Sequence, residues 1–242
     1  RAKAFISVRP TPAAGPSVGE RVLVRVRSLA SSGAGVADLP DGRVAFVQRT
    51  APGDLVEARI VKLHPRWGEA ALLEVLEAGP SRVEAPCPLF DRCGGCSLQH
   101  LGYDEQLRWK RTFVADAMAR IGGLDAPVPA VVPSPRQTGY RNRVTFTVRA
   151  LAKGRWVAGF HALGNPDRIV DVGGECLLPE PPILEAWAAI RSVLRSGALP
   201  LRAMGELRLT LRSLEAGVVL LVKGGARGWD PASLLAQVPD LV

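Results

Sequence analysis

The feature that most constrains this chain is a group of three cysteines within ten residues. Cys87, Cys93 and Cys96 have the spacing C-x5-C-x2-C, and Cys176 follows after 79 further residues. Two glycines separate the last two cysteines of the group, and their backbone freedom predicts a tight loop that turns both thiols toward one centre. Four cysteines in 242 residues are too few for a disulfide framework, so the spacing predicts a metal site in a reducing compartment.

The cysteine spacing leaves two kinds of metal centre open. Structural zinc usually takes two short pairs of ligands, and this chain has only one CxxC pair. A cubane iron–sulfur cluster needs four thiolates, commonly three local and one remote. Because zinc also accepts four thiolates, the spacing favours a cluster and leaves zinc as the alternative.

The charge balance is consistent with a nucleic-acid partner. The chain has 31 Lys and Arg residues against 23 Asp and Glu, a net charge of +8. Arginine supplies most of the positive charge, and its planar guanidinium pairs well with phosphate. A GC-rich codon bias also raises arginine content, so charge alone does not decide the matter. No apolar run reaches the roughly 18–20 residues that cross a bilayer, and the first residues do not have the pattern of the apolar h-region of a signal peptide. We therefore predict a cytoplasmic protein without a membrane partner.

Residues 18–79 have the pattern of a small β-barrel, and residues 1–17 are expected to be a flexible leader. Val22, Val24 and Val26 alternate with outward residues, and Gly33 and Gly35 are expected to form a turn after this strand. Three more strand-like runs follow at 43–49, 55–63 and 69–76. Several short strands within about sixty residues predict an OB-like barrel, a fold that binds oligonucleotides. The cations that we place around it are Arg25, Arg27, Arg43, Arg49, Arg59, Lys62 and Arg66. A solvated charged face is the alternative interpretation.

Residues 80–242 are predicted to form an α+β domain with an antiparallel sheet. Apolar residues at helical spacing predict helices over 103–121 and 182–196. The expected strands span residues 140–150, 155–161, 168–172, 206–214 and 217–223. Asn165-Pro166-Asp167 is expected to be the turn before the third of these strands.

Two resemblances extend this interpretation. The barrel region resembles a TRAM domain, an OB-like RNA-binding barrel, in Gly33-x-Gly35-Val36-Ala37, Asp41-Gly42-Arg43-x-x-Phe46-Val47 and Pro52-Gly53-Asp54. The segment Cys87-Pro-x-Phe-x-x-Cys93-Gly-Gly-Cys96-x-x-Gln99-His100 resembles the cluster motif of the RNA (uracil-5-)-methyltransferase family. The matches that follow in the family's order are Tyr140-Arg141-Asn142-Arg143, Gly159-Phe160-His161, and Ile169-Val170-Asp171 leading to Cys176. The likeness covers roughly residues 20–180 and has its motifs in the expected context.

The resemblance implies roles for particular residues. Cys87, Cys93, Cys96 and Cys176 match the ligands of a [4Fe-4S] cluster. Arg141 and Arg143 match a segment that approaches RNA, and residues two apart share one face of a strand. Salt bridges on a surface strand are the alternative for these arginines.

Three polar residues near the motifs have two interpretations each. Gln99 and His100 follow the cysteine loop directly, and His161 lies in a later motif. Each could hydrogen-bond around the cluster or pack as a satisfied core residue. We expect none of them to be catalytic.

The family's reaction, as the resemblance implies, transfers a methyl group from S-adenosylmethionine to C5 of uridine after a cysteine adds to C6. The uridine must leave its stack, and the ring needs a thiolate nucleophile. If all four cysteines bind the cluster, none remains for this step. No regular glycine-rich cofactor turn is present either, and the stretch at 224–228 is too irregular for one. We therefore expect the methyltransferase domain, with its S-adenosylmethionine, beyond Val242, and this chain alone to be inactive.

We interpret the chain as the RNA-binding and [4Fe-4S] part of a uracil-5-methyltransferase, with 23S rRNA as the preferred substrate and a monomeric state. One alternative is a stand-alone RNA-binding protein held together by a cluster or zinc. Another is a tRNA uracil-5-methyltransferase. Radical methylthiotransferases also combine a TRAM domain with a cluster, but their CxxxCxxC motif and C-terminal TRAM domain differ from the arrangement here.

Overall fold

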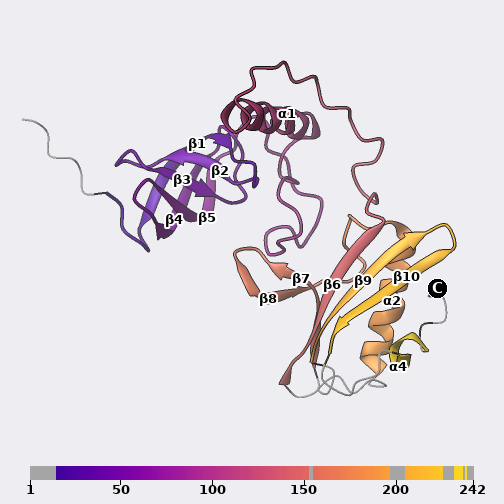
Figure 1. The fold of residues 1–242 in the computed structure, drawn as a ribbon. Helices are drawn as coiled ribbons and strands as arrows, with labels where there is room; N and C mark the ends of the chain where they lie inside the picture. The colour runs from indigo at the N-terminus through magenta and orange to yellow at the C-terminus, as the bar shows by residue number, and fades with distance from the viewer. Residues whose placement is uncertain (1–14, 153–154, 197–204, 226–231, 237, 239–242) are drawn as a thin grey trace, which may run out of the picture. The chain divides into compact units, whose positions relative to one another are not determined.

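The computed structural model describes residues 15–152, 155–196, 205–225, 232–236 and 238. The chain forms two compact units, which we describe separately (Figure 1). The first contains the residues up to Glu84 together with Ser97–Val131, and the second contains Ala85–Cys96 and Val132–Val242. Most of the expected leader and the end of the glycine-rich stretch at 224–228 lie outside the described residues. In the described part of the chain, no helix is long and apolar enough to cross a membrane.

The first unit is built on a closed five-stranded barrel, which confirms the predicted fold. Its strands, in the spatial order β1-β2-β3-β5-β4, are β1 (Arg21–Leu29), β2 (Gly35–Asp38), β3 (Val44–Val47), β4 (Leu55–Leu63) and β5 (Trp67–Glu77). Strands β3 and β5 pair in parallel, and all other neighbours are antiparallel. Val22, Val24 and Val26 point into the barrel core, as their alternation predicts.

Strand β2 was missed by the sequence prediction, which assigned a turn to Gly33 and Gly35. Gly33 has a φ of 85° and does belong to the turn. Gly35 instead begins β2, where a Cβ atom would lie 2.0 Å from Oγ1 of Thr50. A glycine at this position therefore serves close packing inside the barrel, and only the first of the two serves the turn.

The first helix, α1 (Tyr103–Arg120), has the predicted bounds to within one residue. It groups with the barrel, although the sequence placed it in the domain that begins at residue 80. Trp109 and Phe113 pack beside a small buried cluster of Leu29, Ala51 and Leu101. No side chain of α1 is fully buried, so the helix lies on this cluster by one half-buried face.

The second unit contains a five-stranded antiparallel sheet, as predicted for the α+β domain. Its strands, in the order β10-β9-β6-β7-β8, are β6 (Arg143–Ala150), β7 (Trp156–Ala162), β8 (Asn165–Asp171), β9 (Glu206–Leu214) and β10 (Gly217–Gly224). Helix α2 (Pro181–Ser196) packs its buried Ile183, Trp187 and Ile190 against one face of the sheet. The short helix α4 (Ala232–Leu235) adds Leu234 to the same core.

The turn between β7 and β8 is not where the sequence placed it. Asn165-Pro166-Asp167 begins β8, and the turn is formed by Leu163 and Gly164. Gly164 has a φ of 68°, a left-handed conformation that glycine adopts without a steric penalty. The Asn-Pro-Asp sequence was read as a turn because all three residues are common there. Its proline is instead tolerated because β8 is the last strand of the sheet.

Candidate functional site

All four cysteines belong to the second unit. Cys93 and Cys176 are buried, Cys87 and Cys96 are half-buried, and none forms a disulfide. The loop that carries the first three is fixed to the end of β7. The backbone N–H of Gly94 donates to the carbonyl of His161 at 2.9 Å, and that of Leu163 donates to Arg92 at 2.9 Å. These bonds hold the loop with three cysteines at the end of β7.

The two glycines of the cysteine loop lie where a side chain would be crowded by its neighbours, and neither has an unusual backbone angle. Neither Gly94 nor Gly95 has a positive φ, so the expectation based on backbone freedom was wrong. A Cβ atom on Gly94 would lie 3.0 Å from the His161 carbonyl oxygen, and one on Gly95 would lie 3.4 Å from Sγ of Cys93. The loop is packed so closely on β7 that larger residues would push it away.

Cys176 lies within electrostatic range of the other three cysteines. Burial raises the pKa of its thiol to about 11, a hydrogen bond from Leu178 N–H opposes this, and Cys96, Cys87 and Cys93 raise it further. Cys93 and Cys176 belong to one buried cluster, against which Cys87 and Cys96 pack, so the remote cysteine lies in the same core as the local group. Across the described ranges, no three His, Cys, Asp or Glu side chains surround one point as ligands of a single ion. The site is a loose group of four thiols.

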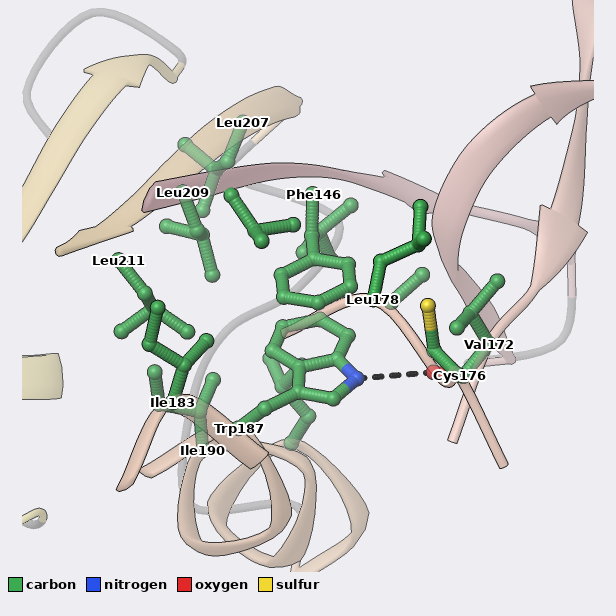
Figure 2. Packing of buried hydrophobic residues seen from close by; sticks show 14 of the residues in the cluster. Phe146, Val172, Cys176, Leu178, Ile183, Trp187, Ile190, Leu207, Leu209 and Leu211 are labelled. Atoms are coloured by element: carbon green, nitrogen blue, oxygen red, sulfur yellow. Dashed lines mark hydrogen bonds between the residues drawn. The ribbon is translucent and has the colours of Figure 1, made fainter. Parts of the chain in front are cut away.

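Helix α2 anchors the segment that leads to Cys176 (Figure 2). Trp187 donates its indole N–H to the Val172 carbonyl at 2.8 Å. Arg191, also buried, donates to both carboxylate oxygens of Asp171 at 2.9 and 2.8 Å and to the same Val172 carbonyl at 3.1 Å. Burial raises the pKa of Asp171, but the bonds from Arg191 outweigh burial and hold it below its usual value. The backbone four residues before Cys176 is thus held by two side chains.

Sequence reasoning singled out Asp171 in a motif but missed Arg191. In α2 this arginine follows the buried Ile190 and shares its apolar surroundings, where its guanidinium lies 4.9 Å from the ring centre of Trp156. A charged residue on the buried face of an otherwise apolar helix is a signal that could have been used, because such residues are rarely buried without a partner.

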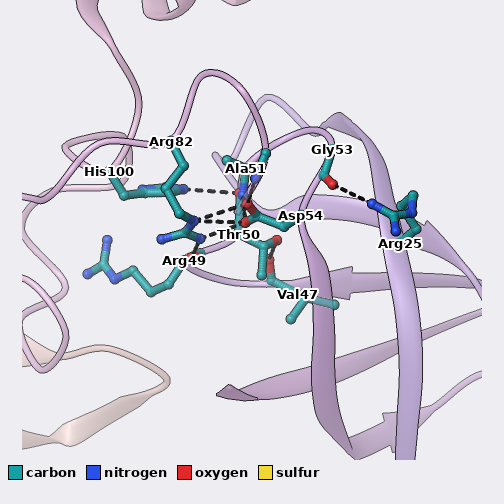
Figure 3. Close-up of polar contacts among 10 residues, drawn as sticks. Arg25, Val47, Arg49, Thr50, Ala51, Gly53, Asp54, Arg82 and His100 are labelled. Carbon is teal, nitrogen blue, oxygen red and sulfur yellow. Dashed lines mark hydrogen bonds and ion pairs between the residues drawn. The ribbon is translucent and has the colours of Figure 1, made fainter. Parts of the chain in front are cut away.

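His100 belongs to the first unit and not to the unit that holds the cysteines. It is almost fully buried, and its Nε2 donates to the Thr50 carbonyl at 3.0 Å (Figure 3). Burial lowers the pKa of His100, so the ring is neutral near pH 7. This contact fits the interpretation of a satisfied core histidine. Gln99 is half-buried in the same unit, and His161 contacts the Pro166 carbonyl through Nδ1 at 2.6 Å.

A buried carboxylate organises the loops beside His100 (Figure 3). Asp54 is fully buried and accepts hydrogen bonds from the backbone N–H groups of Ala51 at 2.6 Å and Gly79 at 2.7 Å. Arg82 completes the arrangement with an ion pair at 2.7 Å and also donates to the Arg49 carbonyl. Burial raises the pKa of Asp54, but Arg82 and the two backbone donors lower it below its usual value overall.

Arg49 was expected on the outer surface of the barrel, and this expectation was wrong. It is only 6% exposed and has a φ of 67°, so its backbone is in the left-handed region. The carbonyl that this conformation presents is the one that Arg82 binds. Arg49 is therefore part of the structural corner around Asp54.

The other arginines proposed on the barrel are exposed or partly exposed, and three of them have acidic partners. Arg25 pairs with Glu77 at 2.6 Å, Arg27 with Asp38 at 3.1 Å and Arg43 with Asp41 at 2.6 Å. Within the described ranges, no ion pair involves Arg59, Lys62 or Arg66, and all three are exposed. The unpaired cations of the barrel thus come from β4 and the turn that follows it.

Arg141 and Arg143 are both exposed in the second unit. Arg143 is the first residue of β6, whereas Arg141 precedes the strand. The backbone of Arg141 bonds to the segment after Cys176, because its N–H donates to Leu178 and its carbonyl accepts from Glu180. The argument that two residues apart share a strand face therefore applies to Arg143 alone, and Arg141 lies instead beside the remote cysteine's segment.

Comparison with known proteins connects these observations. Residues 17–73 match the TRAM domain family. A 23S rRNA (uracil(1939)-C(5))-methyltransferase from Pseudomonas putida is 36% identical over 204 residues, which cover 84% of this chain and 44% of that protein. An RNA methyltransferase from Gloeobacter violaceus is 39% identical over 74% of this chain and 39% of its own length. The crystal structure of a Pyrococcus abyssi tRNA (uracil-54, C5)-methyltransferase with S-adenosyl-L-homocysteine matches with a TM-score of 0.59 and 28% identity, over 88% of this chain and 48% of that one.

The barrel and its family match define the first unit as a TRAM domain, in the class of proteins that bind RNA. Over most of its length the chain is similar to RNA methyltransferases, two of them named for uracil C5, in agreement with the family that its motifs indicated. It spans less than half the length of the relatives described above.

Proposed function

We propose that this chain is the RNA-binding and [4Fe-4S] part of an S-adenosylmethionine-dependent methyltransferase that forms 5-methyluridine in RNA. The observation that carries this proposal is the 36% identity, over 84% of the chain, to an enzyme named for uracil C5 in 23S rRNA. The structural relative from Pyrococcus abyssi is named for a tRNA uracil and was crystallised with S-adenosyl-L-homocysteine. That ligand is the product left when S-adenosylmethionine gives up its methyl group, which supports the choice of cofactor.

Cys87, Cys93, Cys96 and Cys176 are the proposed cluster ligands. The donor set fits, because the four thiols gather at one buried cluster of the second unit and none of them forms a disulfide. A zinc ion needs all its ligands around one point at about 2.3 Å, and the described side chains offer no such group. A cubane attaches each thiolate to a different iron and so suits a wider arrangement. A bound cluster would supply a cross-link between the cysteine loop and the segment after β8.

The proposed chemistry needs a thiolate that adds to uridine C6. All four cysteines of this chain are assigned to the cluster. We therefore place the nucleophile and the S-adenosylmethionine site outside these 242 residues, and the chain alone would bind RNA without methylating it. Its part in the reaction is to hold the RNA while the target base leaves its stack.

RNA binding is proposed for both units, with Arg25, Arg27 and Arg43 on the barrel and Arg141 and Arg143 in the second unit. The acidic partners of Arg25 and Arg27 do not prevent this, because an exposed ion pair is worth only about 0–1 kcal/mol and phosphate can replace the carboxylate. Arg59, Lys62 and Arg66 are equally suitable because they are exposed and have no acid to give up. The charges would position the RNA backbone without reading its sequence.

The proposed activity can be tested by deleting the gene in its own organism and measuring 5-methyluridine by mass spectrometry of digested rRNA and tRNA. Loss of the modified nucleoside from 23S rRNA, with tRNA unchanged, is the expected result. Loss from tRNA alone would overturn the rRNA assignment and favour the tRNA alternative. Unchanged 5-methyluridine in both pools would contradict the proposed function.

Replacing Cys176 by serine is expected to remove most of the iron from anaerobically purified protein, because a cubane needs its fourth thiolate. Iron and sulfide analysis together with the visible absorption spectrum measures the effect. Ser97→Ala is a suitable control, because the exposed Ser97 neighbours the cysteine loop and has no thiol. Stoichiometric zinc in the wild type, or unchanged iron in Cys176→Ser, would contradict the cluster assignment.

A further inference from the structure

The second sheet has a polar face opposite α2. Val144, Phe146 and Val148 of β6 are buried on the α2 side, together with alternate leucines of β9. Because side chains alternate along a strand, the residues between them point to the other face. Four cations lie on this outer face, together with a central pair of threonines. The cations are Arg143, Arg208, Arg212 and Lys223.

The strand register sets these cations directly opposite one another in two pairs. Arg143 of β6 faces Arg212 of β9. Arg208 of β9 faces Lys223 of β10. Like charges directly opposite in an antiparallel pair are destabilising, because the side chains at such positions are close neighbours. One cross-strand cation pair could be incidental, but two on one face of a small sheet form a pattern that costs stability.

The row between the two cation pairs is neutral and already bonded. Thr145 of β6 and Thr210 of β9 face each other, and their hydroxyl oxygens are 2.8 Å apart. The two cations of β9 are four residues apart, which corresponds to about 13 Å along a strand. Leu221 of β10 faces Thr210 in the same row and is exposed. The outer face therefore presents two separate points of positive charge, with the threonine pair and Leu221 between them.

The protein itself does not neutralise these charges in the part that the structure describes. The next row of the same face holds Arg149 and Glu206, which form an ion pair at 2.7 Å. No ion pair among the described residues involves any of the four cations of the outer face. The barrel arginines Arg25, Arg27 and Arg43, by contrast, each have an acid. A negatively charged partner would turn the repulsion within each pair into attraction.

We propose that the outer face of the second sheet, opposite α2, binds the RNA backbone, with one phosphate at the Arg143–Arg212 pair and another at the Arg208–Lys223 pair. This inference rests on the proposed function, because it specifies where the second unit holds the RNA. Two charge points about 13 Å apart suit a polyanion better than a single small anion. Arginine can donate to phosphate from two nitrogens at once, which suits it to a fixed backbone position. Arg208, Arg212 and Lys223 are thus proposed to contact RNA in addition to Arg143 at the start of β6.

The test uses the double substitution Arg212→Thr and Lys223→Thr in the purified 242-residue chain, which removes one cation from each pair and keeps residues that favour strands. Binding to a fluorescent single-stranded RNA oligonucleotide is measured by anisotropy over a range of salt concentrations. The variant should bind more weakly, and the slope of log K against log salt should fall by about 1.4, which corresponds to two phosphate contacts. Its melting temperature at low salt should equal or exceed that of the wild type, because the repulsion is relieved.

The matched control is Arg195→Ala, which removes an exposed cation from the end of α2, the helix on the opposite side of the sheet. Its affinity and salt slope should match the wild type. If the double variant also matches the wild type, the outer face does not bind RNA, although the proposed function can stand. If the wild-type chain itself fails to bind RNA, the proposed function is at fault. A double variant that loses affinity for poly-glutamate but not for RNA would assign the face to an acidic protein and overturn the inference.

Discussion

Replacing Asp54 by asparagine is expected to destabilise the first unit by about 3 kcal/mol, because the change breaks a buried ion pair from one side. Asp54 is fully buried and accepts from two backbone N–H groups and from Arg82. The side-chain N–H₂ group of asparagine would face N–H donors that now bind the carboxylate. The guanidinium of Arg82 would also lose its counter-charge. The side chain of Arg82 is 19% exposed and keeps some contact with water. The expected loss of stability is therefore at the lower end of the range for broken buried ion pairs. Denaturant unfolding measures it.

The matched control is Glu77→Gln, which breaks the Arg25–Glu77 pair on the same barrel. That pair is as short, at 2.6 Å, but both side chains are more than half exposed. Water replaces the lost partner there, so the loss should stay within about 1 kcal/mol. Equal losses in the two variants would mean that Asp54 has no special structural role.

The pH dependence of stability offers a second measurement of the same corner. The pKa of Asp54 is lowered in the folded state, so its contribution is fully present above the ordinary carboxyl pKa and is lost as the pH falls from there through the lower pKa of the folded state. The pKa of His100 is also lowered, so the unfolded chain binds a proton first and stability falls below about pH 6.5. Asp54→Asn should remove the decline near about pH 4 and leave the His100 part in place.

The barrel and the antiparallel sheet were predictable because their core residues alternate strictly. In β1 from Val22 to Val26 and in β9 from Leu207 to Leu211 every second residue is apolar and buried, so the strand and its inward face can both be predicted from the sequence. Gly35 and Asn165 were wrongly predicted to lie in turns, because residue type and not alternation was the signal used there. Both residue types are common in turns, and only the space left by Thr50 or the position of β8 at the sheet edge shows that they lie in strands here.

The cysteine group was predictable from spacing and resemblance, but its supports were not. Arg191 and Trp187 lie 15 and 11 residues after Cys176 and reach back to Asp171 and Val172 through the fold. Likewise, the two cation pairs of the outer face depend on the register between β6, β9 and β10, which joins residues 69 apart in sequence. Periodicity assigns residues to a face, whereas register decides which of them are neighbours.

Replacing Trp187 by alanine is expected to destabilise the second unit by about 3–5 kcal/mol. Trp187 is fully buried, and its ring stacks on Phe146 with centroids 3.9 Å apart and planes 7° from parallel (Figure 2). Trp187→Phe should cost less, because it keeps part of the packing while it removes the indole bond to Val172. Unfolding followed by denaturant measures both changes.

The comparison with Trp109→Phe separates packing from the hydrogen bond. Trp109 also donates its indole N–H, to Glu105 at 2.6 Å, but it is only half-buried on α1. Glu105 keeps its ion pair with Arg108 after that substitution, so the effect should stay within about 0.5 kcal/mol. In Trp187→Phe the buried Val172 carbonyl keeps its bond from Arg191 at 3.1 Å, which limits the added loss to about 1 kcal/mol. A loss as large as that of Trp187→Ala would show that the indole bond, more than the stacked ring, secures the segment before Cys176.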